Sequence, residues 1–479
     1  MPTLNLPDSP RLDHLKKQAK SLLRALRAND PDALALAAEF YRPAVPRLAD
    51  AQLITARRYG FASWSRLVRH LGTVERYTRS PHRQPIGDPS AAPEDEFLRL
   101  ATVYYAGDDP HRRDLAAGLI EKVARSNIYT MAASGEAAAL RAVLANDPSL
   151  ANQQGGPYQW EPLLYLTYSR IERGDALAAA RVLLTYGADP NAGFLWQGLP
   201  SPFTALTGAF GYGEGDPPPH ANRLELARLL LEAGADANDS QTMYNCGPGG
   251  NPPNADHLRL LLEFGLGQGD GGPWHARLTS AHPTPAQLLE DELVYAASAG
   301  LLERVHLVLD AGVAVDGRGT AHPGFRGHSA YELAEIHGHS EIAQLLREAG
   351  AVPLDDVHQL LRATMRADRD AVVRLTADKG LAARAIAREP YLPIRAAQLG
   401  LVEALPILAE LGFDLNVMGR STALHEAAFA GDLPTVKALI ALGADPTLRD
   451  PTYNTTPSTW ATHNNHPTTA TYLATLPHP

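Results

Sequence analysis

A tripeptide that recurs along most of the chain constrains its fold more than any other feature. Gly-Ala-Asp occurs at Gly187–Asp189, Gly234–Asp236 and Gly443–Asp445. The shortest steps between such glycines are 31 residues, and two steps are 47 residues long, which indicates one repeat enlarged by an insertion. Periods in this range are typical of arrays in which each unit buries its apolar face against the next one. Looser copies begin at Gly312, Gly350 and Gly412.

The clearest copy covers residues 422–445 and has the pattern of two helices joined by a tight turn. Thr422 is placed to cap the first helix by accepting a backbone N–H. Apolar residues at helical spacing, with Leu424 in the first helix and Leu439 in the second, predict buried faces. Gly431 and Gly443 fall where the two helices should end, and glycine tolerates the left-handed backbone needed there.

This copy resembles the ankyrin repeat. It reads Thr-Ala-Leu-His-Glu-Ala-Ala from Thr422, then Gly431, a Val-x-x-Leu-Ile pattern and Gly-Ala-Asp, and it departs from the family in having Ala423 where proline is usual. The resemblance implies an all-α fold, an ankyrin-type α-solenoid of about nine or ten helix-turn-helix repeats with short hairpin fingers. It also implies that His425 bridges neighbouring loops through hydrogen bonds of its ring.

A small helical module is expected before the repeats, and it resembles the module that precedes ankyrin repeats in many bacterial proteins. The predicted organisation is a basic helical module at 1–77, a Pro-rich linker at 78–93, a helical cap at 94–126 and the repeat array at 127–479, with insertions near 191–222, 239–255 and 267–287.

Charge is unevenly distributed along the chain. The formal net charge is −10, yet residues 1–80 hold 14 Lys and Arg against 7 Asp and Glu. A solvated basic helix face explains this bias, and a nucleic-acid-associated regulator acting through residues 1–77 is the alternative function.

The composition also bears on location. No window approaches the ~18 consecutive apolar residues of a membrane span, and no secretory signal is visible at the amino terminus. The single cysteine, Cys246, allows no internal disulfide. We therefore expect a cytoplasmic protein with no membrane partner.

Motifs that would carry chemistry are weak. Gly267-x-Gly269-x-x-Gly272 matches a dinucleotide pattern, but the preceding residues 258–264 read as a helix, whereas that motif follows a strand. Cys246 lies in a turn-rich segment, and no nucleophile elbow or compact catalytic set is evident. A group of four histidines could hold a metal ion, but a Gly-His pair in the turn between helices is a common sequence pattern in ankyrin repeats. We expect no enzyme activity, no cofactor and no metal; the histidines are His322, His328, His337 and His339.

Aromatic residues and one arginine in the loops between repeats are the candidate contacts for a partner. Exposed aromatics and arginine are favoured at binding hot spots. The alternative is that these side chains pack the enlarged insertions together. The predicted function is a scaffold or adaptor that binds an unidentified protein on the concave face of the array; a small-molecule or nucleotide-binding protein or enzyme using the insertions is the least favoured alternative. The candidate residues are Phe194, Leu195, Trp196, Trp274, Phe325, Arg326 and Tyr453.

Overall fold

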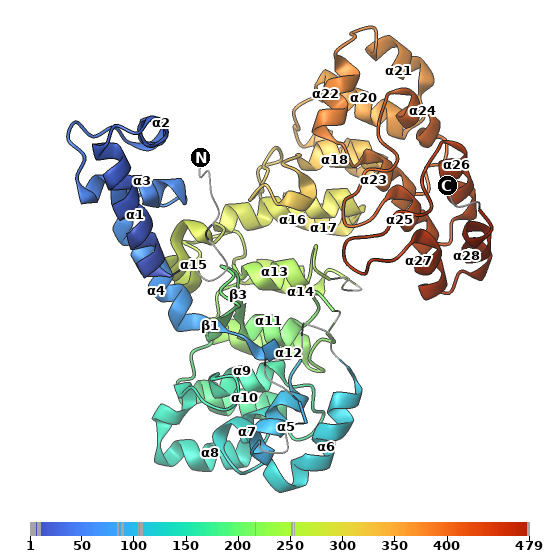
Figure 1. Ribbon diagram of the computed structural model, residues 1–479. Coiled ribbons are helices and arrows are strands. Elements are labelled where there is room, and N and C mark those ends of the chain that lie inside the picture. The colour runs from blue at the N-terminus through green and yellow to red at the C-terminus, as the bar shows by residue number, and fades with distance from the viewer. Residues whose placement is uncertain are drawn as a thin grey trace. The chain divides into compact units, whose positions relative to one another are not determined.

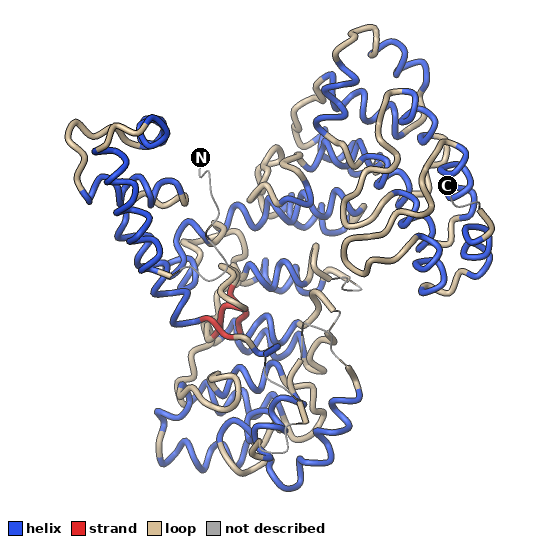
Figure 2. The backbone as a smooth tube through the Cα atoms, viewed as in Figure 1, coloured by secondary structure: helices blue, strands red, loops and turns tan. Residues whose placement is uncertain are grey.

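The computed structural model describes residues 6, 11–83, 86–87, 91–103, 105, 109–215, 217–250, 252 and 254–476. Secondary structure in these residues is mostly helical, as expected, with a few short strands (Figure 2). The chain divides into two compact units, Met1–Glu292 and Leu293–Pro479. Within the described ranges, no helix is long and apolar enough to cross a membrane.

Four helices open the first unit, where the sequence predicts the helical module. Asp30 caps the second of them by accepting the Ala33 N–H at 3.0 Å, and Ser63 caps the fourth. Leu15 and Leu67, both fully buried, join the first and fourth helices in one apolar cluster. The helices are α1 (Leu12–Arg27), α2 (Pro31–Phe40), α3 (Leu48–Arg58) and α4 (Trp64–Tyr77).

The predicted linker 78–93 begins with regular secondary structure. Thr78–Arg79 forms strand β1 and pairs in parallel with β2 (Gly193–Trp196). Strand β2 pairs in turn with β3 (Pro202–Thr204) in an antiparallel hairpin, so the unit is not purely α-helical. Arg79 Nε also donates to the Gln159 carbonyl at 3.2 Å. Residues 84, 85 and 88–90 of the expected linker lie outside the described residues.

Helix pairs fill the rest of the first unit. The first helices of successive pairs, α7, α9, α11 and α13, contact one another in order, and the second helices, α8, α10, α12 and α14, form a parallel row (Figure 1). Each pair thus buries its apolar face against its neighbours. The helices are α5 (Pro93–Ala101), α6 (His111–Val123), α7 (Ile128–Ala133), α8 (Ala137–Asn146), α9 (Pro162–Tyr168), α10 (Ala176–Thr185), α11 (Ala205–Phe210), α12 (Arg223–Glu232), α13 (Ser240–Asn245), α14 (Asp256–Glu263) and α15 (Gly272–Leu278).

Two segments expected to be loop insertions contain helices. Residues 239–255 begin with α13, whose first turn is capped by Asp239. Residues 267–287 include α15, where Gly271 and Pro273 flank the first helical residue. Both helices are only about two turns long and lie next to glycine-rich segments. So short a helix does not show the repeated apolar spacing by which a helix is recognised in a sequence.

The second unit has the same helix-pair organisation. The first helices of three successive pairs, α23, α25 and α27, contact one another in order. The loops of the second unit lie beside these helices (Figure 2). One continuous apolar cluster runs from Ile336 to Leu473. The boundary between the units falls within α16 (Pro285–Ala299). The remaining helices are α17 (Leu302–Asp310), α18 (Ala330–His337), α19 (Ser340–Glu348), α20 (Asp356–Met365), α21 (Arg369–Leu375), α22 (Leu381–Arg388), α23 (Leu392–Gln398), α24 (Ala404–Glu410), α25 (Ala423–Phe429), α26 (Leu433–Ala441), α27 (Pro457–His463) and α28 (Pro467–Ala474).

The clearest sequence copy folds as its pattern indicates. Thr422 caps α25 by accepting the His425 N–H at 3.4 Å. Gly431 and Gly443 follow α25 and α26 with φ of 70° and 94°. His425 Nε2 lies 3.1 Å from the carbonyl oxygen of Thr455 in the next loop. The predicted bridging role of His425 is therefore confirmed.

Candidate functional site

Three of the candidate loop residues are buried, which corrects the expectation that they are exposed. Phe194, Leu195 and Trp274 have exposed fractions of 2%, 0% and 5%. Phe194 stacks between Trp160 and Phe203, with ring centroids 4.8 and 5.5 Å away. Strand β1 extends the sheet at the edge of β2, Leu195 packs against Trp274 of α15, and Phe194 packs against Trp160, so large side chains are buried on both faces of the hairpin. These residues hold the fold of the first unit and offer no surface to a partner.

Trp196, at the end of β2, is half-buried. Its ring lies 5.9 Å from Tyr105 and 5.7 Å from Phe203, between centroids. It belongs to the same aromatic packing as Phe194.

Phe325 and Arg326 are partly buried by contacts within the second unit. The Phe325 ring lies 5.5 Å from that of His322. Arg326 Nε lies 3.0 Å from Glu389, and its guanidinium sits over the Tyr391 ring at 5.6 Å. The Arg326 side chain therefore serves an intramolecular network.

Tyr453 differs from the other candidates because its side chain is 74% exposed. It lies in the loop between α26 and α27, and a buried carboxylate, Asp450, holds that loop. Asp450 accepts the N–H groups of Tyr453 and Thr455 at 2.6 and 3.0 Å, and the indole N–H of Trp460 at 3.1 Å. Burial raises the pKa of Asp450, but a hydrogen bond from the Thr455 hydroxyl at 2.6 Å, together with these bonds, more than offsets it, so the pKa lies well below its ordinary value. An exposed aromatic ring is thus held on a fixed loop.

Two further aromatic rings lie on α25 and α27, the helices on either side of the α26 repeat segment and this loop in the chain. The Phe429 side chain, at the end of α25, is 41% exposed and lies 5.8 Å from the half-buried Trp460 ring. Trp460 in turn bonds the Tyr453 loop through Asp450. We call Phe429, Tyr453 and Trp460 the aromatic face. Sequence reasoning missed Phe429 and Trp460 because both lie within helical repeats, where apolar residues are normally buried.

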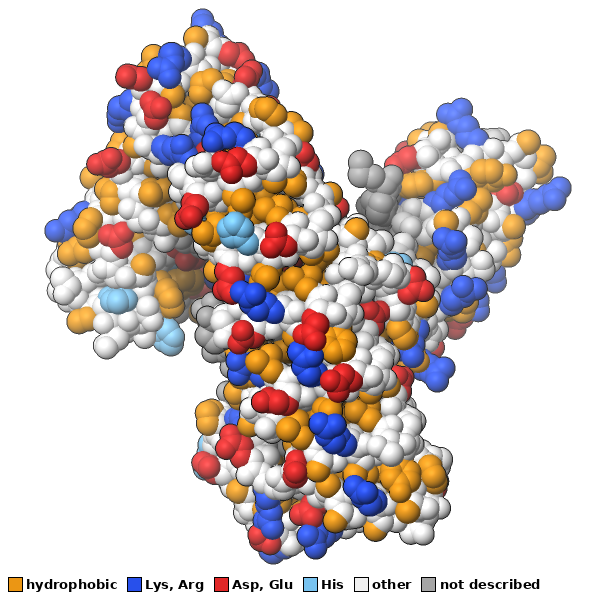
Figure 3. Space-filling view, turned by 180° about the vertical axis from the view of Figure 1, so that it is seen from behind, with side chains coloured by type: hydrophobic (Ala, Val, Ile, Leu, Met, Phe, Trp, Pro, Cys, Tyr) orange, Lys and Arg blue, Asp and Glu red, His pale blue; other side chains and the backbone are white. Residues whose placement is uncertain are grey.

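The first four helices carry an exposed basic surface (Figure 3). Near it, α4 and α15 border a recess of about 150 Å³ lined by Arg66, Arg69, His70, Arg277 and Thr279. Burial lowers the pKa of His70. The exposed basic residues of α1 are Lys16, Lys17, Lys20, Arg24 and Arg27.

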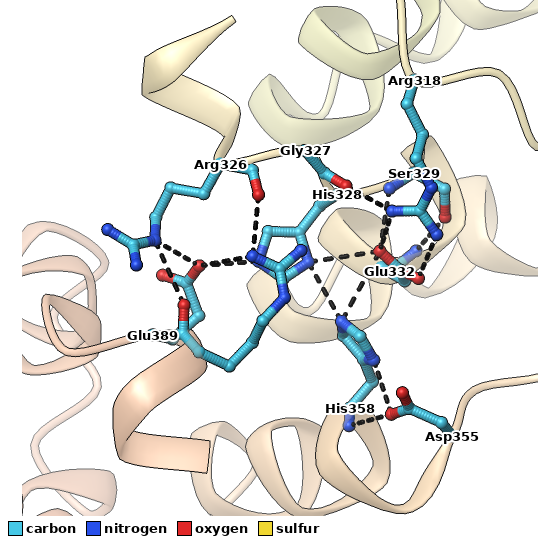
Figure 4. Close-up of polar contacts among 10 residues, drawn as sticks. Arg318, Arg326, Gly327, His328, Ser329, Glu332, Asp355, His358 and Glu389 are labelled. Atoms are coloured by element: carbon cyan, nitrogen blue, oxygen red, sulfur yellow. Dashed lines mark hydrogen bonds and ion pairs between the residues drawn. The ribbon is translucent and has the colours of Figure 1, made fainter. Parts of the chain in front are cut away.

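The four histidines singled out in the sequence do not form one group. His337 and His339 both contact the carbonyl oxygen of Ser298, at 2.9 and 3.2 Å. His328 instead meets Glu332 and His358 in a buried polar cluster (Figure 4). His358 lies 30 residues after His328 in the sequence, on another helix pair, so no local sequence motif predicts the cluster.

The glycine motif at 267–272 and Cys246 lie in surroundings that do not suit nucleotide binding or catalysis. Helix α14, and no strand, precedes Gly267 and Gly269. Cys246 is fully buried. Neither arrangement resembles a phosphate-binding turn or an accessible nucleophile.

Comparison with known proteins identifies the C-terminal repeats. The family profile described as ankyrin repeats, in three copies, matches residues 393–478. A search of curated proteins found no match. Residues 393–478 therefore carry ankyrin repeats, a type of repeat that generally mediates protein–protein interaction.

Proposed function

We propose that this protein is a non-enzymatic scaffold or adaptor that binds a protein partner, and that the aromatic face is its contact surface. The observation that carries the proposal is Tyr453, 74% exposed on a loop fixed by the buried Asp450. This loop lies within the matched ankyrin repeats.

The physical reason is preorganisation. A surface that is already ordered loses little conformational entropy on binding, so a few anchoring side chains can dominate the affinity. Large aromatic side chains are the usual anchors at such surfaces. Phe429, Tyr453 and Trp460 supply three of them on neighbouring elements.

A longer array is part of the same proposal. The two rows of helices in the first unit and the repeated pairs in the second support about nine or ten ankyrin-type repeats over residues 127–479. The aromatic face would then be part of the concave surface that fingers and first helices form within the second unit.

The experiment compares partner binding by variants of the full chain. Tagged protein is used to isolate a partner from its own cells, and the dissociation constant of the purified pair is then measured. Tyr453→Ala is expected to weaken binding about tenfold or more, since a hot-spot residue contributes over ~1.4 kcal/mol. Val373→Ala is the matched control, because this apolar residue of α21 is 71% exposed and lies outside the face.

Two results would overturn the proposal. Equal affinity for wild type and Tyr453→Ala would place the contact elsewhere. Recovery of nucleic acid alone, released by nuclease or by high salt, would favour a regulator acting through the basic surface of α1 and the recess at Arg66 and Arg69.

A further inference from the structure

The buried cluster in the second unit brings three metal-ligating side chains to one point (Figure 4). His328 precedes α18, Glu332 lies in its first turn, and His358 lies in the first turn of α20. His328 Nδ1 is 3.1 Å from His358 Nε2 and 3.2 Å from Glu332 Oε2. The third side of this triangle, from His358 Nε2 to Glu332 Oε2, is 3.5 Å.

The outer nitrogen of each ring faces a second carboxylate. His328 Nε2 lies 2.6 Å from Glu389 Oε1, and His358 Nδ1 lies 2.6 Å from Asp355 Oδ1. An ionised carboxylate only accepts hydrogen bonds, so both outer nitrogens carry the hydrogen. In a neutral imidazole the inner nitrogen then presents a lone pair. Two lone pairs and a carboxylate oxygen converge, and such an arrangement requires a positive charge at its centre, either a proton or a metal ion.

The triangle has the dimensions of a tetrahedral metal site. Ligand atoms about 2.0–2.1 Å from Zn²⁺ are about 3.3 Å apart in a tetrahedron, and the three distances above bracket that value. Two imidazoles with one carboxylate form a common three-ligand zinc set. Carboxylates on the outer nitrogens, here Asp355 and Glu389, are the usual partners that orient metal-bound histidines.

Arginine side chains already bind the carboxylates of this cluster, so a bound metal ion would have to replace some of their contacts. Arg318 donates to both Glu332 oxygens, at 2.9 and 3.0 Å, and the Ser329 N–H donates to Oε2 at 2.9 Å. Arg326 and Arg388 lie 3.0 and 3.9 Å from Glu389. A bound ion would coordinate Oε2 in place of the Arg318 Nη1 donor, while Arg318 Nη2 keeps its hydrogen bond to Oε1.

We propose that His328, His358 and Glu332 bind one divalent transition-metal ion of the Zn²⁺ class, which ties the first turns of α18 and α20 together. Asp355 and Glu389 are positioning residues, since they touch the ligands and not the ion. Three protein ligands leave the fourth position of a tetrahedral ion for a water molecule. The site would lie between neighbouring helix pairs of the same unit.

The test uses tag-free full-length protein, stripped with a chelator and titrated with ZnCl₂ in a calorimeter. We expect one equivalent to bind, with proton release and a raised melting temperature. His358→Gln and Glu332→Gln should abolish stoichiometric binding, and Asp355→Asn should weaken it roughly 10- to 100-fold. His337→Gln, a histidine of α18 outside the cluster, is the matched control.

Co²⁺ gives a second readout, because its visible absorption is intense in tetrahedral coordination. Circular dichroism checks that each variant is folded. If His358→Gln does not fold, Asp355→Asn still tests the proposal, because the Asp355 side chain is 65% exposed and its replacement should leave the fold intact. Absence of zinc binding by wild type would overturn the proposal and leave a proton at the centre. Binding that survives His358→Gln and Asp355→Asn unchanged would also overturn it.

Discussion

Asp239, the residue that caps α13, shows how burial of one carboxyl group makes stability depend on pH. Burial raises its pKa to about 6, although the Thr204 hydroxyl and the Thr242 N–H, the latter at 2.8 Å, donate to it. The folded pKa exceeds the unfolded one, so the folded state binds more protons between the two values. The contribution of Asp239 to the free energy of unfolding is therefore greatest below pH 4 and is lost as the pH rises through 6.

The Asp239→Asn variant tests this sign. Asparagine does not ionise and keeps one oxygen to accept the Thr242 N–H, while its NH2 replaces the oxygen that accepts from the Thr204 hydroxyl. The stability of the variant relative to wild type should therefore rise between pH 4 and pH 7, by about 2–3 kcal/mol. Urea unfolding of both proteins at pH 4, 5, 6 and 7 measures this difference. A constant difference across the range would contradict the assigned pKa shift.

Single residues also show which sites the sequence can predict. The roles of Thr422 and His425 follow from a local pattern, because each acts within one turn or on the next loop. The cluster of His328, Glu332 and His358 could not be predicted, because its members meet only once two repeats stack. Phe194 and Trp274 were wrongly expected to be exposed for a related reason. An aromatic residue in a loop is exposed only if no element distant in the sequence covers it.

At the scale of elements, α15 joins the opening helices to the β2–β3 hairpin. Trp274 donates its indole N–H to the Asn191 carbonyl at 3.1 Å, and its ring lies 5.0 Å from that of Tyr77 in α4. Val74 and Leu195 complete this cluster. Helices α1–α4 were predictable from their apolar spacing, whereas strand β1, two residues long, has no period that a sequence could show.

The Trp274→Ala variant should loosen this junction. Loss of a buried tryptophan costs about 3–5 kcal/mol, and the cavity would adjoin α4 and β2. Hydrogen exchange is expected to become faster in residues 64–79 and 193–204. Tyr453→Ala removes an exposed ring and should leave these segments unchanged, and protection that is equal in Trp274→Ala and wild type would show that α15 does not hold α4.

At the scale of the whole molecule, successive first helices and successive second helices of the pairs contact one another in order, so a local defect should stay local. Leu439 of α26 is fully buried in the apolar cluster of the second unit. Leu439→Ala should cost about 2–5 kcal/mol and speed hydrogen exchange in residues 392–474, while residues 128–232 keep wild-type rates. Val373→Ala, at an exposed position of α21, should change neither region. If exchange in residues 128–232 also accelerated in Leu439→Ala, the chain would unfold as one cooperative body, and stacking by nearest neighbours would not describe its stability.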